Sequence, residues 1–305
     1  MRGVLATWIG SCFGVTWRVT SRLSVVRVSD INVNMSTRAE DHIQVISDLH
    51  LENPTAYDVF EIPPRAPHLA LIGDIGHAKD DGLYHFLRKQ LEAFETVFYV
   101  LGNHEPYHTC WHFTKSRLRD FETSIDGERQ STKSLGRFVL LDRTRYDLSS
   151  QVTILGCTLH SRVQSAQSDH VSFGLNDFYH IKDWTTDKHT EAHDTDVAWL
   201  DTQVSEIAAT QPDRQLIVFT HHSPTTDPRT IHPAHVNGNM SSGFMTDLSS
   251  ALCWTSPNVK VWGFGHTHYN CDFFDGKTGK RVLANQRGYY FSAAQGFEAE
   301  KVLCL

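Results

Sequence analysis

One run of residues constrains this chain more than any other: a continuously apolar stretch that stops at a glycine and a group of polar side chains. Residues 97–101 are all apolar or aromatic, and Gly102, Asn103, His104 and Glu105 follow them directly. Aromatic and β-branched residues without polar alternation predict a strand covered on both faces, as in an α/β sheet. Gly102 allows a sharp turn, so Asn103 and His104 are expected at the carboxyl end of the strand, where open α/β folds bind ligands.

Four further apolar runs end in the same way, in Asp or His. Residues 43–46 lead to Asp48-Leu49-His50, residues 69–72 to Gly73-Asp74, residues 215–219 to Thr220-His221-His222, and residues 259–262 to Gly263-Phe264-Gly265-His266-Thr267-His268. Carboxylate, amide and imidazole groups are ligands of divalent metals. The sequence therefore predicts that donors far apart along the chain converge at strand ends to form one metal site.

In the order D-x-H, GD, GNHE, H and GHxH, these motifs resemble those of the calcineurin-like metallophosphoesterase superfamily. All five motifs are present, and the likeness runs from about Ile43 to the last expected strand near Val302. Five motifs in this order, each behind a strand, form a highly specific signal. The resemblance implies an α/β fold, a four-layer α/β/β/α sandwich of two mixed sheets flanked by helices, with a dinuclear metal site at the carboxyl ends of the strands.

The resemblance also implies the ligand set. Asp74 is expected to bridge two divalent ions, one of which is completed by Asp48, His50 and His268 and the other by Asn103, His221 and His266. These mixed oxygen and nitrogen donors suit Mn, Zn, Fe or Co and disfavour calcium. His222 adjoins His221, but side chains alternate along a strand, so only one of the two can face the metals and His221 is the expected ligand.

A metal-dependent phosphoric ester hydrolase is the function that the resemblance implies. A hydroxide bridging the two ions would attack the phosphorus in line with the leaving oxygen. With two carboxylates and that hydroxide, the cluster keeps a charge of about +1 and attracts a phosphate dianion. His104, next to a ligand, is the expected general acid for the leaving oxygen. Glu105 either orients His104 or holds the turn through backbone contacts, and the structural role is preferred.

The details of the motifs argue against a protein Ser/Thr phosphatase, whose branch has D-x-H-G, GDxVDRG and RGNHE. Here Leu51 follows the first motif, residues 75–77 are Ile-Gly-His after the second, and Leu101 precedes the third. The GHTH turn and the later run of residues 283–289, Leu-Ala-Asn-Gln-Arg-Gly-Tyr, are similar to those of small, poorly characterised phosphoesterases. A small phosphomonoester or phosphodiester is the expected substrate.

The alternative is a non-catalytic scaffold of the metallophosphoesterase fold that binds other proteins. Such domains tend to lose a ligand or the motif histidine, and here none is missing. A nuclease is disfavoured because the net charge is −7 and the chain has no long Lys/Arg cluster, so no nucleic-acid partner is expected.

The cysteines and the apolar stretches limit the compartment. The six cysteines are scattered without a CxxC pair, which favours a reduced compartment over a disulfide framework and excludes a zinc ribbon. The uncharged stretch at residues 3–17 is too short to span a bilayer, so no membrane association is expected. The oligomeric state stays open.

Residues 1–34 are expected to be a removable leader or a poorly ordered extension. Residues 1–29 contain four Arg and no acid, with Ser and Thr throughout, which is the composition of a mitochondrial presequence. Alternatively, translation begins at Met35. The protein is expected in the cytoplasm, or in mitochondria if residues 1–34 are a true presequence. Residues 35–305 are expected to form one metallophosphoesterase domain.

Two stretches, residues 161–195 and 225–243, show neither helical nor strand period and are expected to be lid-like loops near the metals. For the first, a solvated surface loop is an equal alternative. Its polar residues are Asn176, Asp177, Tyr179, His180, Lys182, His189 and His193. His77 and His160 are weaker candidates for substrate contacts. Arg229 is expected in an exposed ion pair rather than on phosphate.

Overall fold

The computed structural model describes residues 41–132 and 134–304, so the predictions for residues 1–34 lie outside the described residues. One sheet has the strand order β13-β1-β2-β3-β4. Its strands are β1 (Ile43–Ile46), β2 (His68–Ile72), β3 (Thr96–Val100), β4 (Arg137–Leu141) and β13 (Val302–Leu303). All neighbours are parallel except β13, which pairs antiparallel with β1.

The second sheet has the order β5-β6-β7-β8-β10-β9, with antiparallel strands at its two edges. Its strands are β5 (Thr144–Asp147), β6 (Val152–Cys157), β7 (Gln215–Thr220), β8 (Val259–Phe264), β9 (Cys271–Phe274) and β10 (Arg281–Ala284). A separate two-stranded hairpin consists of β11 (Gly288–Tyr289) and β12 (Ser292–Ala293).

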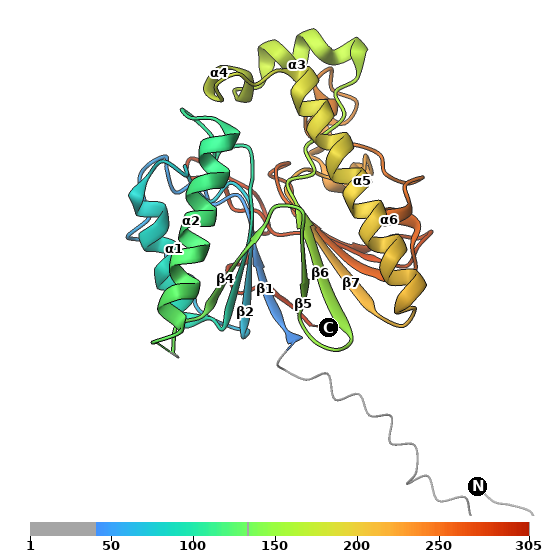
Figure 1. Cartoon of the computed structure of the whole chain (residues 1–305). Helices are drawn as coiled ribbons and strands as arrows, with labels where there is room; N and C mark the ends of the chain where they lie inside the picture. Colours follow the sequence, from blue (N-terminus) through green and yellow to red (C-terminus); the bar gives the residue numbers. More distant parts are fainter. Residues whose placement is uncertain (1–40, 133, 305) are drawn as a thin grey trace, which may run out of the picture. The chain divides into compact units, whose positions relative to one another are not determined.

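Helices cover the outer faces of both sheets (Figure 1). The helices are α1 (Asp81–Ala93), α2 (Trp111–Arg129), α3 (Ser168–Gly174), α4 (Asp177–His180), α5 (Thr186–Thr210) and α6 (Leu252–Thr255). Short 3-10 turns are η2 (Ser165–Gln167), η3 (Pro228–Thr230), η4 (Pro233–His235) and η5 (Ser241–Gly243).

The side chains of β3 show why four layers form. Val97 and Tyr99 pack in one apolar cluster with Leu83 of α1, whereas Phe98 packs in another cluster with Phe219 of β7. Both faces of the strand are therefore buried, as its continuous apolar sequence requires. A third cluster joins the second sheet to α5 and α6. The predicted α/β/β/α sandwich of two mixed sheets is confirmed.

The expectation that residues 161–195 lack regular structure is wrong. The stretch holds η2, α3, α4 and the first turns of α5, which starts at Thr186 and runs for 25 residues. The buried positions of those first turns are His189, His193 and Asp196. Their spacing is helical, but the residues are polar, so a search for apolar periodicity detects only the later half of α5. Residues 225–243 contain only 3-10 turns and connecting loops.

Two further observations concern membrane-spanning helices and the cysteines. Among the described residues, no helix combines the length and apolar character needed to cross a membrane. The cysteines in the same part of the chain, Cys110, Cys157, Cys253, Cys271 and Cys304, all have free thiols.

Candidate metal centre

The fold brings the predicted donors to one place, at the strand ends over which α3 and α4 lie (Figure 1). Asp48, His50 and His268 form one group whose ligand atoms all lie within 4.8 Å of one another. The Nε2 atoms of His50 and His268 are 3.0 Å apart, and His268 Nε2 is 3.4 Å from Asp48 Oδ1. Ligands at about 2.0–2.1 Å from one ion lie about 3.0–3.4 Å from each other, so these separations fit a shared cation.

A second group consists of Asp74, His221 and His266. His221 Nε2 lies 3.4 Å from Asp74 Oδ1 and 3.0 Å from Asn103 Oδ1. His266 Nε2 is buried and has no hydrogen-bond partner, although buried polar atoms normally have one. The other oxygen of Asp74, Oδ2, lies 3.9 Å from His50 Nε2. The Asp74 carboxylate is thus placed between the two groups.

Contacts of the Nδ1 atoms orient the imidazole rings of two predicted ligands. His221 Nδ1 donates to the carbonyl oxygen of Ile72 at 2.9 Å, which turns Nε2 toward Asn103 and Asp74. His50 Nδ1 lies 3.3 Å from Glu52 Oε1, which turns its Nε2 toward His268 in the same way. Such partners fix the tautomer that a metal ligand needs.

The backbone at this centre adopts conformations that non-glycine residues rarely use. Among the described residues with positive φ are Asp48 at 54°, His50 at 48°, Asp74 at 54°, His266 at 70° and His268 at 48°. Each such residue costs about 1–3 kcal/mol, and such strain clusters at functional sites. The sequence could not show this cost.

Gly102 is required for a different reason from the one predicted. Its φ is not positive, but a Cβ at this position would overlap the carboxylate and backbone of Asp74. The glycine therefore allows the third strand end to approach the second, which places Asn103 beside Asp74.

The two buried carboxylates stabilise positive charge at the centre. Burial opposes ionisation of Asp74, yet His221 and His104 hold its pKa well below the usual range. Burial lowers the pKa of His221, but Asp74 and Asp48 outweigh this effect and raise it to about 10. Burial and the nearby His221 lower the pKa of His266 to about 3, so this imidazole is neutral, as a ligand must be.

His104 lies beside the carboxylate proposed to bridge. Its backbone N–H donates to Asp74 Oδ1 at 2.8 Å, and its Nε2 lies 3.9 Å from Asp74 Oδ2. Its Nδ1 is 2.9 Å from Glu52 Oε1. Burial raises the pKa of Glu52, but the hydrogen bonds from His104 and His50 outweigh it and lower that pKa to about 2. The Glu52 carboxylate thus contacts both His50, a predicted ligand, and His104, the predicted acid.

Glu105 holds the turn rather than orienting His104. Its Oε2 accepts from the backbone N–H of Gly102 at 2.7 Å and of Asp74 at 3.1 Å. Its Oε1 accepts from the N–H of Ile75 at 2.9 Å and from the hydroxyl of Tyr99 at 2.8 Å. The fully buried carboxylate therefore ties the second and third strand ends together.

Asp177 fixes the amide of Asn103. Asp177 Oδ1 accepts from Asn103 Nδ2 at 2.8 Å and from the Tyr107 hydroxyl at 2.6 Å. Because a carboxylate only accepts, the NH2 group of Asn103 must face Asp177 and its Oδ1 must face His221. Asp177 belongs to α4, so this segment reaches the centre through a buried contact.

Removing the Asp177 carboxylate is expected to weaken metal binding at Asn103. In Asp177→Ala the amide loses the acceptor that sets its orientation, and outer contacts of this kind are worth about 10–100-fold in metal affinity. Titration calorimetry with Mn²⁺ on metal-free protein measures the effect. Asp169→Ala, at an exposed position of α3, is the matched control and should bind as the wild type does. Equal affinity of both variants would show that Asp177 does not orient Asn103.

The other candidate residues belong to neither donor group. The ring of His222 packs on that of His266, with ring centroids 4.1 Å apart, and the ring of His160 lies 5.7 Å from that of His222. A ring nitrogen of His77 lies within 4.8 Å of donor atoms of Glu52 and His104, and its ring packs against Tyr107 and His108. Arg229 forms an exposed ion pair with Asp227 at 2.7 Å.

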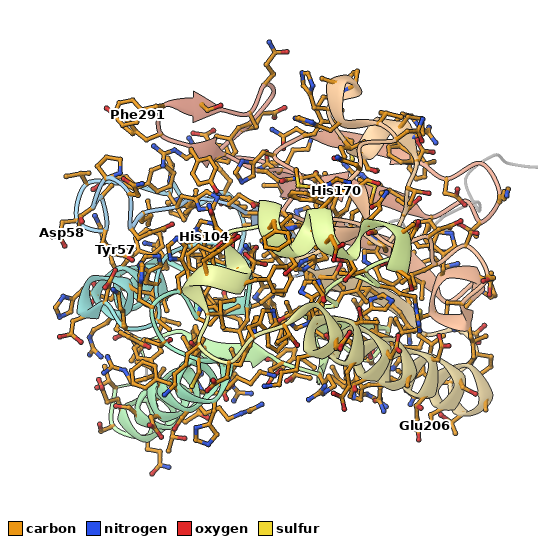
Figure 2. The ribbon with its side chains drawn as sticks, turned by 90° about the horizontal axis from the view of Figure 1, so that it is seen from above. Tyr57, Asp58, His104, His170, Glu206 and Phe291 are labelled. Atoms are coloured by element: carbon orange, nitrogen blue, oxygen red, sulfur yellow. The ribbon has the colours of Figure 1, made fainter. Side chains whose placement is uncertain are left out.

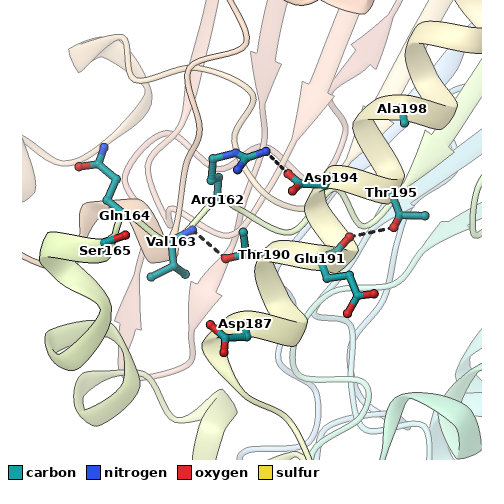
Figure 3. A pocket seen from close by; sticks show the side chains of 10 residues that line it. All are labelled: Arg162, Val163, Gln164, Ser165, Asp187, Thr190, Glu191, Asp194, Thr195 and Ala198. Atoms are coloured by element: carbon teal, nitrogen blue, oxygen red, sulfur yellow. Dashed lines mark hydrogen bonds and ion pairs between the residues drawn. The ribbon is translucent and has the colours of Figure 1, made fainter.

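A surface cavity of about 990 Å³ lies elsewhere, between residues 162–165 and the amino-terminal half of α5 (Figure 3). Asp187, Glu191 and Asp194 line it, and Arg162 is already paired with Asp194. None of the predicted ligands lines this cavity, and its acidic wall would repel a phosphate ester. The candidate site is therefore identified by its metal-binding side chains rather than by the size of a cavity.

Three residues that contact a predicted ligand or the predicted acid were not predicted in this role: Glu52, Asp177 and Tyr289. Glu52 follows His50 by two residues, so a D-x-H-x-E pattern carries a signal for it. Asp177 was only one of several polar residues in its segment. Tyr289 ends the run of residues 283–289, and its hydroxyl lies 3.3 Å from His104 Nε2.

The chain is similar to several known proteins. The Uncharacterized protein L509 of Acanthamoeba polyphaga mimivirus is 28% identical over 265 residues, covering 81% of this chain and 91% of the relative. Phosphopantetheinyl hydrolase from Mycobacterium tuberculosis has a similar fold, with a TM-score of 0.58, 16% identity and coverage of 81% of this chain and 89% of that one. A dimetal phosphatase from Danio rerio gives a TM-score of 0.48 at 14% identity, covering 80% and 86%. Residues 42–270, which include all five motifs, match the calcineurin-like phosphoesterase family, and the chain belongs to that family.

Proposed function

We propose that this protein is a metal-dependent phosphoric ester hydrolase that holds two divalent ions and cleaves a small phosphomonoester or phosphodiester. One observation carries the proposal. Seven donor residues from five strand ends converge. The ligand atoms of Asp48, His50 and His268 lie within 4.8 Å of one another, and so do those of Asp74, His221 and His266. The seventh donor, Asn103, has its Oδ1 3.0 Å from His221 Nε2. The Nε2 atoms of His50 and His268 lie 3.0 Å apart, and His266 Nε2 is buried without a hydrogen-bond partner. Bound cations would supply the missing partner for these nitrogens.

We expect the donors to divide between two ions in the way that the motifs predict. Asp48, His50 and His268 would hold one ion, Asn103, His221 and His266 the other, and Asp74 both. Bound there, two divalent ions would activate a water for in-line attack and neutralise charge on the phosphoryl group. The oxygen and nitrogen donors suit Mn, Zn, Fe or Co.

His104 is the group of this chain that would handle the leaving oxygen. Glu52 accepts from its Nδ1, which fixes the ring and leaves Nε2 directed at the centre. Burial lowers the pKa of His104, but Asp74 and Glu52 outweigh burial and raise it to about 9, and bound cations would oppose this increase. A protonated Nε2 can donate its proton to the departing oxygen.

The scaffold alternative lacks a supporting observation. A domain used only for protein contacts has no need of strained backbone at Asp48, His50, Asp74, His266 and His268. The full donor set, with His104 and its carboxylate partner in place, favours hydrolysis.

The test is turnover of p-nitrophenyl phosphate and bis-p-nitrophenyl phosphate with added Mn²⁺ or Zn²⁺. Hydrolysis of at least one of these esters is expected, and removal of the metal with EDTA should abolish it until metal is restored. The ratio of the two rates distinguishes a monoesterase from a diesterase. If neither ester is cleaved while metal is demonstrably bound, the scaffold becomes the better account.

A further inference from the structure

The run of residues 283–289 is a sequence feature that the ligand set does not use, and its last part is fastened to the loops that carry the ligands. Gln286 Oε1 accepts from the backbone N–H of His268 at 2.5 Å. Arg287 Nη1 donates to the carbonyl oxygen of Leu49 at 2.8 Å. These contacts hold the start of the β11–β12 hairpin against the D-x-H and GHxH loops.

The hairpin places Tyr289 over the centre. Gly288 has a φ of 75°, which favours glycine and turns the chain into the hairpin. The ring of Tyr289 then lies 4.3 Å from that of His50 and 4.8 Å from that of His268, measured between centroids. Its hydroxyl is 3.3 Å from His104 Nε2. The side chain is 39% exposed, so one side of it remains open to solvent.

The position of the hydroxyl has a chemical consequence that rests on the proposed function. A leaving oxygen that accepts the proton of His104 must lie within hydrogen-bond distance of Nε2. The Tyr289 hydroxyl is already within reach of that same atom. A phenol, with an ordinary pKa of about 10, keeps its proton at neutral pH and can donate a hydrogen bond.

We propose that Tyr289 is a second catalytic residue on the leaving-group side, donating a hydrogen bond to the leaving oxygen beside His104. In the reaction, a water gives up one proton to solvent and its oxygen bonds to phosphorus, while the bond between phosphorus and the leaving oxygen breaks with its electron pair on that oxygen. The proton from His104 Nε2 goes to the leaving oxygen. Tyr289 keeps its own proton and stabilises the charge that develops before the transfer is complete.

This role predicts a dependence on the leaving group. A poor leaving group, such as an unsubstituted phenol, develops more charge that needs stabilisation than p-nitrophenol does. Loss of the hydroxyl should therefore cost more with the poorer leaving group. A residue that only supports the shape of the site would slow all esters by the same factor.

The hairpin itself offers a matched control. Tyr290 is the next residue and is 55% exposed, and its neighbour Phe291 is 88% exposed. Figure 2 shows Phe291 at the edge of the molecule. The ring of Tyr290 packs on Phe291 at 4.9 Å rather than on a predicted ligand. Tyr290→Phe therefore removes a hydroxyl from the same hairpin without touching the centre.

The experiment compares wild type, Tyr289→Phe and Tyr290→Phe on a series of substituted phenyl phosphate esters whose phenols differ in pKa, with metal content measured in parallel. For Tyr289→Phe we expect kcat/KM to fall about 10-fold or more with the phenyl ester and less than about 3-fold with the p-nitrophenyl ester. Tyr290→Phe should match wild type throughout, and metal content should be equal in all three.

Two results would overturn the role of Tyr289 while leaving the hydrolase intact. One is an equal loss in Tyr289→Phe across the whole series. The other is loss of bound metal in Tyr289→Phe, which would make the residue a support for His50 and His268. If wild type cleaves no ester of the series, the proposed function fails, and the role of Tyr289 fails with it.

Discussion

Replacing Asp74 by asparagine is expected to remove bound metal and to reduce ester hydrolysis by about 10³-fold or more. The amide keeps the size of the side chain and an oxygen that can accept from the backbone N–H of His104. It removes the charge that lies between the two donor groups, 3.4 Å from His221 Nε2 and 3.9 Å from His50 Nε2. One neutral oxygen cannot hold two cations as a carboxylate does.

Metal content by plasma mass spectrometry and turnover of the better ester measure the effect of Asp74→Asn, and circular dichroism checks the fold. Asp58→Asn, at an exposed position before α1, is the control and should leave both quantities unchanged. A full complement of metal in Asp74→Asn would show that Asp74 is not the shared ligand.

His104→Ala is expected to reduce turnover by about 10²–10⁴-fold and to leave metal content unchanged. Removal of a general acid raises the barrier by about 3–5 kcal/mol, since each tenfold loss is about 1.4 kcal/mol. The loss should be largest with esters of poor leaving groups, which depend most on protonation. Steady-state kinetics and metal analysis of the same preparation provide both readouts.

His108→Ala supplies the control for this variant. His108 lies four residues further along the same loop, is exposed, and contacts no predicted ligand. It should be as active as wild type. Geometry also groups His104 with His50 and Asp74 at distances that a metal ligand could have. Loss of metal in His104→Ala would therefore make His104 a ligand and would contradict its role as the acid.

The fold and the donor set could be predicted from the sequence because both depend on short-range patterns. Each of five apolar runs is followed within a few residues by its donors, so finding the strands also finds the ends that carry Asp48, Asp74, Asn103, His221 and His266. The parallel order of the first three strands then places three of those ends side by side. The match to the calcineurin-like family covers these runs together.

Two contacts at the centre could not be predicted, because they join residues that are far apart in the sequence. Asp177 contacts Asn103 across 74 residues of sequence, and Glu52 contacts His104 across 52. The first turns of α5 were wrongly predicted as a loop, since His189, His193 and Asp196 fill the buried positions that apolar residues usually occupy. Glu105 is the opposite case, because the sequence favoured a role in holding the turn through backbone contacts, and three of the four hydrogen bonds that it accepts come from backbone N–H groups.

The central claim is that the converging donors hold two divalent ions per chain. The most direct measurement is the number of Mn²⁺ ions bound per chain, determined by plasma mass spectrometry after metal-free protein is loaded with Mn²⁺ and desalted. We expect about two ions per chain in wild type, with hydrolysis appearing as the second ion binds. A wild-type protein that binds no ion under these conditions, or that cleaves phosphate esters equally well without metal, would contradict the account.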